Sequence, residues 1–124
     1  MDDIVKTPEE LGKKLKNNES VIIIEGDLRN QVLRIKAVGK ISWVVAIGAI
    51  ALAVAFVLNS NGEKTINHAL ALVPVASAIP IFGGIATTVA AISIASAAGS
   101  AFVLSKLRDY DILSDTGERI ILKK

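Results

Sequence analysis

The chain has 124 residues, enough for one domain, and 52% of them are hydrophobic. Its charges are segregated: residues 1–40 carry 15, residues 106–124 carry 9, and residues 41–105 carry only two. A soluble domain interleaves charged and apolar residues, because each helix or strand has a side that faces solvent. This distribution therefore argues against an ordinary soluble enzyme domain. It predicts a membrane-spanning middle with polar ends.

The polar N-terminal segment, residues 1–27, predicts a cytoplasmic helix followed by a strand. Thr7 can cap a helix that starts at Pro8, and Glu10 completes the capping box. The β-branched run at residues 21–24 is typical of a short strand.

The polar C-terminal segment, residues 107–124, predicts a β-hairpin. Its apolar runs at residues 110–113 and 119–122 flank a turn that contains Asp and Gly. Because an isolated hairpin is only marginally stable in water, we expect residues 21–24 to join it as a third strand. This small sheet requires both ends of the chain on one side of the membrane.

Residues 28–58 predict a basic juxtamembrane helix that continues into a first transmembrane span. No strong breaker interrupts the helical pattern, although Gly39 is the expected flexible point. The uncharged part, residues 41–58, would extend about 27 Å, close to the hydrocarbon thickness of about 30 Å. Trp43 lies where an interfacial aromatic anchor is expected.

The second apolar region is too long for one crossing and is expected to break near Pro74, Pro80 and Gly83. Residues 59–80 would form a polar outer turn and a short outer or re-entrant half-helix, and residues 81–106 a second span. Three crossings are the alternative.

Basic residues flank both ends of the apolar region, so the positive-inside rule favours an even number of crossings. The predicted fold class is therefore an α-helical membrane protein. It would be a two-span transmembrane hairpin with an intervening short half-helix and a small cytoplasmic α+β cap, which consists of the N-terminal helix and the three-stranded sheet. This protein would lie in the cell membrane, with several crossings and both termini cytoplasmic.

Small residues recur at every fourth position of the second predicted span, and the first span has a shorter version. Such rows let helices approach closely in lipid. We expect them to support a homo-oligomer, the alternative being that they pack only the two spans of one chain. The predicted packing residues are Gly83, Thr87, Ala91, Ala95, Gly99, Ala49 and Ala53.

Hydroxyl side chains lie roughly opposite this row and are predicted to line a polar path through an assembly. The alternative is that each hydroxyl bonds to its own helix backbone. The candidate pore-lining residues are Thr88, Ser93, Ser96 and Ser100.

The sequence offers little for catalysis. There is no cysteine, His68 is the only histidine, and no metal or phosphate-loop motif is present. No carboxylate or base lies inside either predicted span, since Lys106 stands at the very end of the second, and this argues against proton-coupled transport. A net charge of +2 is too small to indicate nucleic-acid binding. We expect no enzymatic activity, cofactor, metal or nucleic-acid partner.

Three functional hypotheses remain. The first is a weakly selective homo-oligomeric pore or ion channel that permeabilises the membrane, like a toxin, abortive-infection or holin-like effector, gated by its cytoplasmic cap. The second is a non-conducting anchor or adaptor that displays its sheet to a soluble cytoplasmic partner. The third is an accessory subunit that binds an anionic headgroup or a small-molecule signal, although its basic residues also fit ordinary positive-inside charge: Arg29, Arg34, Lys36 and Lys40.

Overall fold

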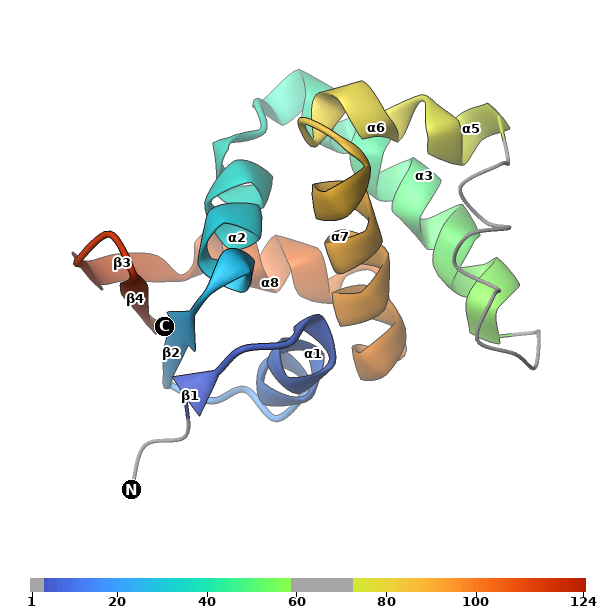
Figure 1. Ribbon diagram of the computed structural model, residues 1–124. Helices are drawn as coiled ribbons and strands as arrows, with labels where there is room; N and C mark the ends of the chain where they lie inside the picture. The colour runs from blue at the N-terminus through green and yellow to red at the C-terminus, as the bar shows by residue number, and fades with distance from the viewer. Residues whose placement is uncertain (1–3, 59–72) are drawn as a thin grey trace.

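The computed structural model describes residues 4–58 and 73–124, which form a small α+β fold around a four-stranded sheet (Figure 1). The strand order is β1-β2-β4-β3; β1 runs parallel to β2, and the other neighbours are antiparallel. The strands are β1 (Ile4–Val5), β2 (Val21–Glu25), β3 (Asp111–Asp115) and β4 (Arg119–Lys123).

The predicted pairing of residues 21–24 with the C-terminal hairpin is confirmed. Ile23 of β2 lies opposite Ile121 of β4, which in turn lies opposite Ser114 of β3. The sheet has four strands rather than the expected three, because the two-residue strand β1 adds to the free edge of β2. Two residues are too few for a visible period in the sequence, so β1 was not predicted.

The helices cover one face of this sheet, where alternate strand residues such as Ile22, Ile24 and Ile120 are buried. The predicted cap at the start of the first helix is confirmed, since the Glu10 amide donates to Thr7 Oγ1 over 3.2 Å. The helices are α1 (Pro8–Lys16), α2 (Asp27–Ala37), α3 (Lys40–Leu58), α5 (Val73–Ala76), α6 (Ala78–Ile81), α7 (Ile85–Ala98) and α8 (Val103–Asp109).

The predicted two-span transmembrane hairpin is wrong. Among the described helices, only α3 is by itself long and apolar enough to cross a membrane. The predicted second span is broken: α7 has 14 residues, and α8 leaves it at an angle of 109°. Gly99 ends α7 in the left-handed conformation with a φ of 82°, and such a glycine terminates a helix.

The apolar middle of the chain instead supplies the core of the α+β fold. Helix α7 packs against α1, α2 and α3, and it lies between α2 and α3 in Figure 1. Its residues Ile92, Ile94 and Ala95 are fully buried. The charged helices α1, α2 and α8 come from the two ends of the chain, and each packs against α7. The charges are therefore segregated along the sequence even though charged and apolar helices belong to one fold.

Close packing of α1 on α7 depends on a glycine that the sequence analysis did not single out. Gly12 is buried in α1, and a Cβ atom at this position would lie 2.4 Å from the carbonyl oxygen of Ile94 and 2.8 Å from Cβ of Ala97. The two helix backbones therefore meet directly at Gly12.

The expected continuous helix over residues 28–58 is also broken. Helix α2 ends at Ala37, Val38 is extended with a ψ of 130°, and α3 begins at Lys40. The break thus contains Gly39, the predicted flexible point. Within the predicted outer segment, residues 59–80, only the short helices α5 and α6 belong to the described residues, and His68 lies outside them.

Candidate functional site

Helix α3 exposes a continuous apolar surface. One side packs into the fold through residues such as Ala46, Ile50 and Ala53. On the other side, Ile41 is 87% exposed and Val44 70% exposed. We call this exposed side the α3 face, and its large apolar residues are Ile41, Val44, Val45, Leu52 and Leu58.

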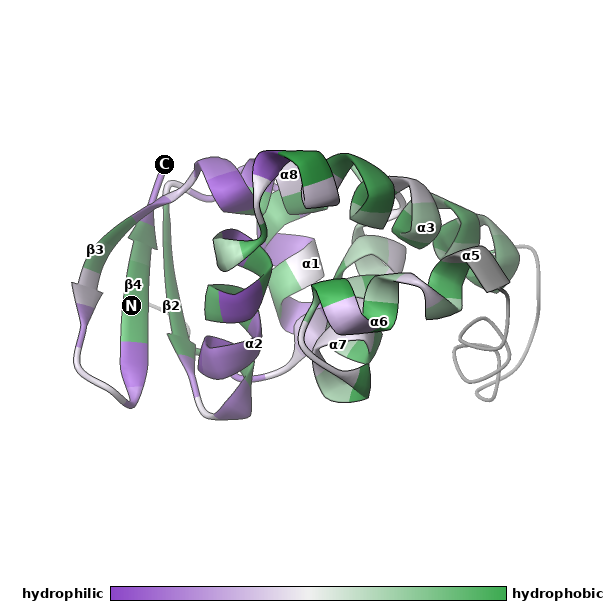
Figure 2. Ribbon diagram, turned by 90° about the horizontal axis from the view of Figure 1, so that it is seen from above, coloured by the Kyte–Doolittle hydropathy of each residue, from purple (hydrophilic) through white to green (hydrophobic). Residues whose placement is uncertain are grey.

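The α3 face does not resemble the surface of a core helix in a soluble protein. Only 28% of the most apolar 18-residue window of α3 is buried, whereas a core helix is mostly buried. Contiguous apolar surface of this kind marks contact with a membrane or a partner. Figure 2 shows hydrophobic residues along α3 and in the strands β2 and β4, with hydrophilic residues in α2 and at the strand ends.

The predicted packing row serves contacts within one chain. Thr87, Ala91 and Ala95 are fully buried in the fold. Gly83 and Gly99 have φ values of 83° and 82° and lie just outside α7, so the row is not one continuous helical surface. Ala49 and Ala53 lie on the buried side of α3. Assembly into a homo-oligomer stays a prediction.

The four predicted pore-lining hydroxyls do not share one open surface within the described part of the chain. Thr88 is buried, and its Oγ1 donates to the carbonyl of Gly84 over 2.8 Å. Ser93 is 7% exposed. Ser100 Oγ accepts from the Phe102 amide over 3.2 Å in the turn after α7, and Ser96 Oγ is buried without a described partner. Pore formation therefore stays a prediction, and the two-span subunit on which it was based is absent from the described part of the chain.

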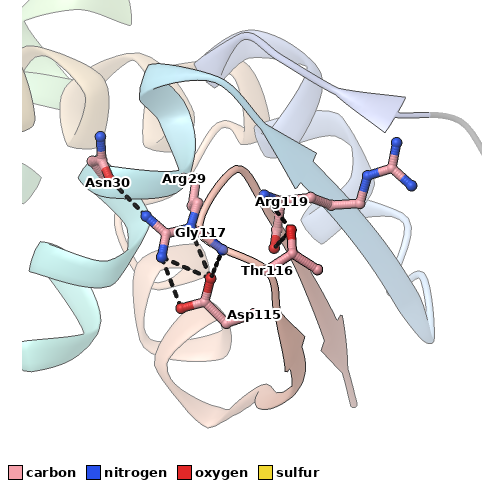
Figure 3. Close-up of polar contacts among 6 residues, drawn as sticks. All are labelled: Arg29, Asn30, Asp115, Thr116, Gly117 and Arg119. Carbon is pink, nitrogen blue, oxygen red and sulfur yellow. Dashed lines mark hydrogen bonds and ion pairs between the residues drawn. The ribbon is translucent and has the colours of Figure 1, made fainter.

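The four predicted basic ligands are distributed among different contacts. Arg29 binds both carboxylate oxygens of Asp115 at 2.7–2.9 Å and thereby joins α2 to the end of β3, as Figure 3 shows. Asp115 also accepts from the Gly117 amide over 3.0 Å. Arg29 is thus occupied by a structural ion pair.

Lys36 caps the C-terminus of α8. Its ammonium donates to the carbonyls of Leu107 and Arg108 over 3.2 and 3.1 Å, and also to that of Tyr110. Burial lowers the pKa of Lys36, and the charge of Asp111 partly opposes this effect. Carbonyls at a helix end lack intrahelical donors, so Lys36 supplies the hydrogen-bond donors for the last carbonyls of α8.

Arg108 caps α2 in return. Its guanidinium donates to the carbonyl of Ile35 over 2.9 Å and lies 4.3 Å from the ring centroid of Trp43. Trp43 also packs edge-on against Phe82. Trp43, predicted as an interfacial anchor, is therefore partly covered by the fold, and Arg108 has a role that sequence reasoning missed because its partner is 73 residues away.

Arg34 and Lys40 remain exposed. Arg34 Nη1 lies 3.5 Å from the carbonyl oxygen of Gly83, at the start of α7. Lys40 is the first residue of α3. The structure therefore does not bring the four basic residues into one cluster, and of the four only Arg34 and Lys40 are exposed.

Replacing Asp115 by asparagine is expected to weaken the fold at neutral pH but not in acid. The Gly117 amide and the Arg29 guanidinium hold the pKa of Asp115 below its ordinary value of 3.8. The native state therefore favours the ionised carboxylate, and this stabilisation is present above pH 3.8 and is lost as the pH falls through the lower native pKa. Chemical denaturation between pH 7 and acid should show the difference between wild type and Asp115→Asn shrinking.

The control for this experiment is Glu118→Gln, because Glu118 is exposed in the same turn. This variant should differ little from wild type at any pH. A difference between wild type and Asp115→Asn that stays constant into acid would contradict the assignment.

The described residues form a small α+β fold in which α3 is the candidate membrane helix. Across residues 4–58 and 73–124, no three carboxylate or histidine side chains lie together as a metal site. A family model described as "Uncharacterised protein PM1101" matches residues 4–123, so the chain belongs to this family. No curated protein and no solved structure matches the chain.

Proposed function

We propose that the protein is a membrane-associated anchor that buries the α3 face in the bilayer and displays its sheet at the membrane surface to a soluble partner. The observation that carries this proposal is the exposure of Ile41 and Val44 on a helix without any charge after Lys40. Each large apolar side chain moved from water into lipid contributes about 1.5–3 kcal/mol.

The packing of α3 favours a helix that lies along the membrane rather than one that crosses it alone. Its buried side contacts α5, α6 and α7, so these elements must follow α3 into any bilayer. Helix α7 also contacts α1 and α2, whose outer faces carry charged side chains such as Lys13, Lys16 and Arg34. Charges at the bilayer centre are expensive, so the α3 face enters lipid while α1 and α2 stay wet.

The free edge of β3 supports the display part of the proposal. The edge strand exposes Ile112 and Leu113, which are 44% and 63% accessible. A sheet edge of this kind can accept a strand from another protein. The irregular pairing between Ile112 and Ser114 limits how long such an added strand can be.

The membrane part is tested by flotation with phosphatidylcholine vesicles. The full chain should float with the vesicles, and the double variant Ile41→Gln/Val44→Gln should partition at least about tenfold less because it loses apolar transfer energy. Both residues are exposed, so circular dichroism should show an unchanged fold.

The control is Ile112→Gln/Leu113→Gln, which removes two large apolar residues that are also exposed, although less so than Ile41 and Val44, from β3. It should float like wild type. Recovery of the wild-type chain as a monodisperse species without detergent or lipid would contradict the proposal, as would equal flotation of both double variants.

A further inference from the structure

The exposed side of α2 and the start of α7 enclose a polar hollow. It lies beside the first turn of α7, which follows Gly84. The N-cap residue of α7 is Gly84, which has no side chain to cap the helix. The residues that line the hollow are Asp27, Asn30, Gln31, Arg34, Ala86 and Thr87.

The first turn of α7, which contributes Ala86 and Thr87 to the hollow, has amides without an acceptor in the helix. The first amide that bonds back to the helix start is that of Thr88, which donates to Gly84 O over 3.2 Å. The three preceding amides therefore have no acceptor within the helix, and the helix dipole places partial positive charge there. A Cβ atom on Gly84 would meet nothing within 4 Å, so the position just before the first turn of α7 is open.

Thr87 provides the independent indication that a ligand belongs in the hollow. Its side chain is fully buried, and its Oγ1 has no hydrogen-bond partner among the described residues. Buried hydroxyls are normally paired, and an unpaired one calls for an explanation such as a missing ligand. The neighbouring Thr88 shows the contrast, because its Oγ1 is satisfied by Gly84 O.

Arg34 supplies a positive charge at the same place. Its Cδ lies 3.6 Å from the position of a Cβ on Gly83, and its Nη1 reaches the carbonyl of Gly83. Arg29 and Arg108 are bound to Asp115 and Ile35 respectively, whereas Arg34 has no carboxylate partner among residues 4–58 and 73–124. Its remaining donors can form charge-assisted bonds to an oxyanion.

We propose that this hollow binds a phosphate group through the amides at the start of α7, the hydroxyl of Thr87 and the guanidinium of Arg34. Asp27 lies on the rim and opposes an anion, so it tunes the affinity downward. The phosphate can belong to a free solute or to a lipid headgroup. Only the lipid source rests on the proposed membrane function; the site itself does not.

The test is a titration of the full chain with inorganic phosphate, followed by the amide NMR signals of residues 85–87. Arg34→Gln should weaken binding about tenfold or more, because a charge-assisted bond is lost. Asp27→Asn should tighten binding. Lys40→Gln is the matched control, since it removes the same charge from an exposed residue that does not line the hollow, and it should leave the affinity unchanged.

Thr87→Val separates a ligand contact from a structural role. It removes an unpaired buried hydroxyl, so the free protein should melt at a higher temperature, and yet its phosphate affinity should fall. A higher melting temperature with unchanged affinity would remove Thr87 from the site. Absence of phosphate-dependent shifts at residues 85–87 in wild type, or equal losses in Arg34→Gln and Lys40→Gln, would overturn the proposal.

Vesicles distinguish the two sources of phosphate. If lipid is the source, adding phosphatidic acid to phosphatidylcholine vesicles should increase flotation of wild type but not of Arg34→Gln. If a free solute is the source, inorganic phosphate should bind while phosphatidic acid gives both proteins the same increase. Flotation on pure phosphatidylcholine without phosphate binding would refute this site and leave the membrane proposal intact. Phosphate binding without flotation would refute the membrane proposal and leave this site intact.

Discussion

Replacing Gly12 by alanine is expected to destabilise the protein by about 3 kcal/mol, the upper part of the range for overpacked cores. The new Cβ would lie 2.4 Å from the carbonyl oxygen of Ile94. This oxygen belongs to the backbone of α7, so α1 and α7 must separate to relieve the clash. Chemical denaturation of wild type and Gly12→Ala measures the difference in the free energy of unfolding.

The same substitution at Gly48 is the control. Gly48 lies within α3, and its Cβ would meet nothing within 4 Å. Alanine is favoured over glycine inside a helix by about 0.5–1 kcal/mol, so Gly48→Ala should be neutral or stabilising. If both variants lose stability to the same extent, the close contact between α1 and α7 is not what makes Gly12 necessary.

Replacing Lys36 by methionine is expected to cost about 2–3 kcal/mol. The aliphatic part of the side chain is kept, but the carbonyls of Leu107, Arg108 and Tyr110 lose their common donor. Removing one partner from a part-buried, charge-assisted hydrogen bond leaves the other unsatisfied, which is the costly case. Urea denaturation at neutral pH provides the measurement.

Lys40→Met is the matched control, because Lys40 is exposed at the start of α3, and exposed substitutions usually change stability by less than about 0.5 kcal/mol. The double variant Lys36→Met/Arg108→Met adds a further test. Each residue caps the helix that carries the other, so the two losses should not be additive. Equal effects at Lys36 and Lys40 would contradict the cap.

Local signals in the sequence predicted local structure correctly. Thr7 and Glu10 mark the start of α1 through contacts only three residues apart. The β-branched run of β2 and the turn between β3 and β4 were equally visible, and the need to cover the hairpin predicted its pairing with β2. Each of these elements has one apolar and one polar side, so only a few ways of packing them bury the apolar side.

The fate of the apolar helices could not be predicted in the same way. A helix that is apolar on all sides fits either a membrane or a protein core, and composition does not distinguish the two. Helix α7 is a core helix because Gly12 lets α1 approach it and Gly99 ends it early. Both facts depend on tertiary contacts or on backbone conformation rather than on hydropathy.

The candidate site was only partly visible in the sequence for a similar reason. Positive charge before an apolar helix was easy to recognise, but the partners of Arg29 and Lys36 lie more than 70 residues away. Thr87 was predicted to pack helices, and only the structure places it beside Arg34 in a polar hollow. The spacing of residues within one helix does not reveal which residues of other helices they contact.

The position of β4 in the sheet has a consequence during synthesis. This strand lies between β2 and β3, and its residue Ile120 pairs with Ile24, which leaves the ribosome almost the whole chain earlier. The sheet therefore stays incomplete until translation has passed residues 119–123, and until then the edge of β2 that pairs with β4 is uncovered. Stalled chains that end before β4 should therefore be prone to aggregation, because the edge of β2 lacks its partner strand.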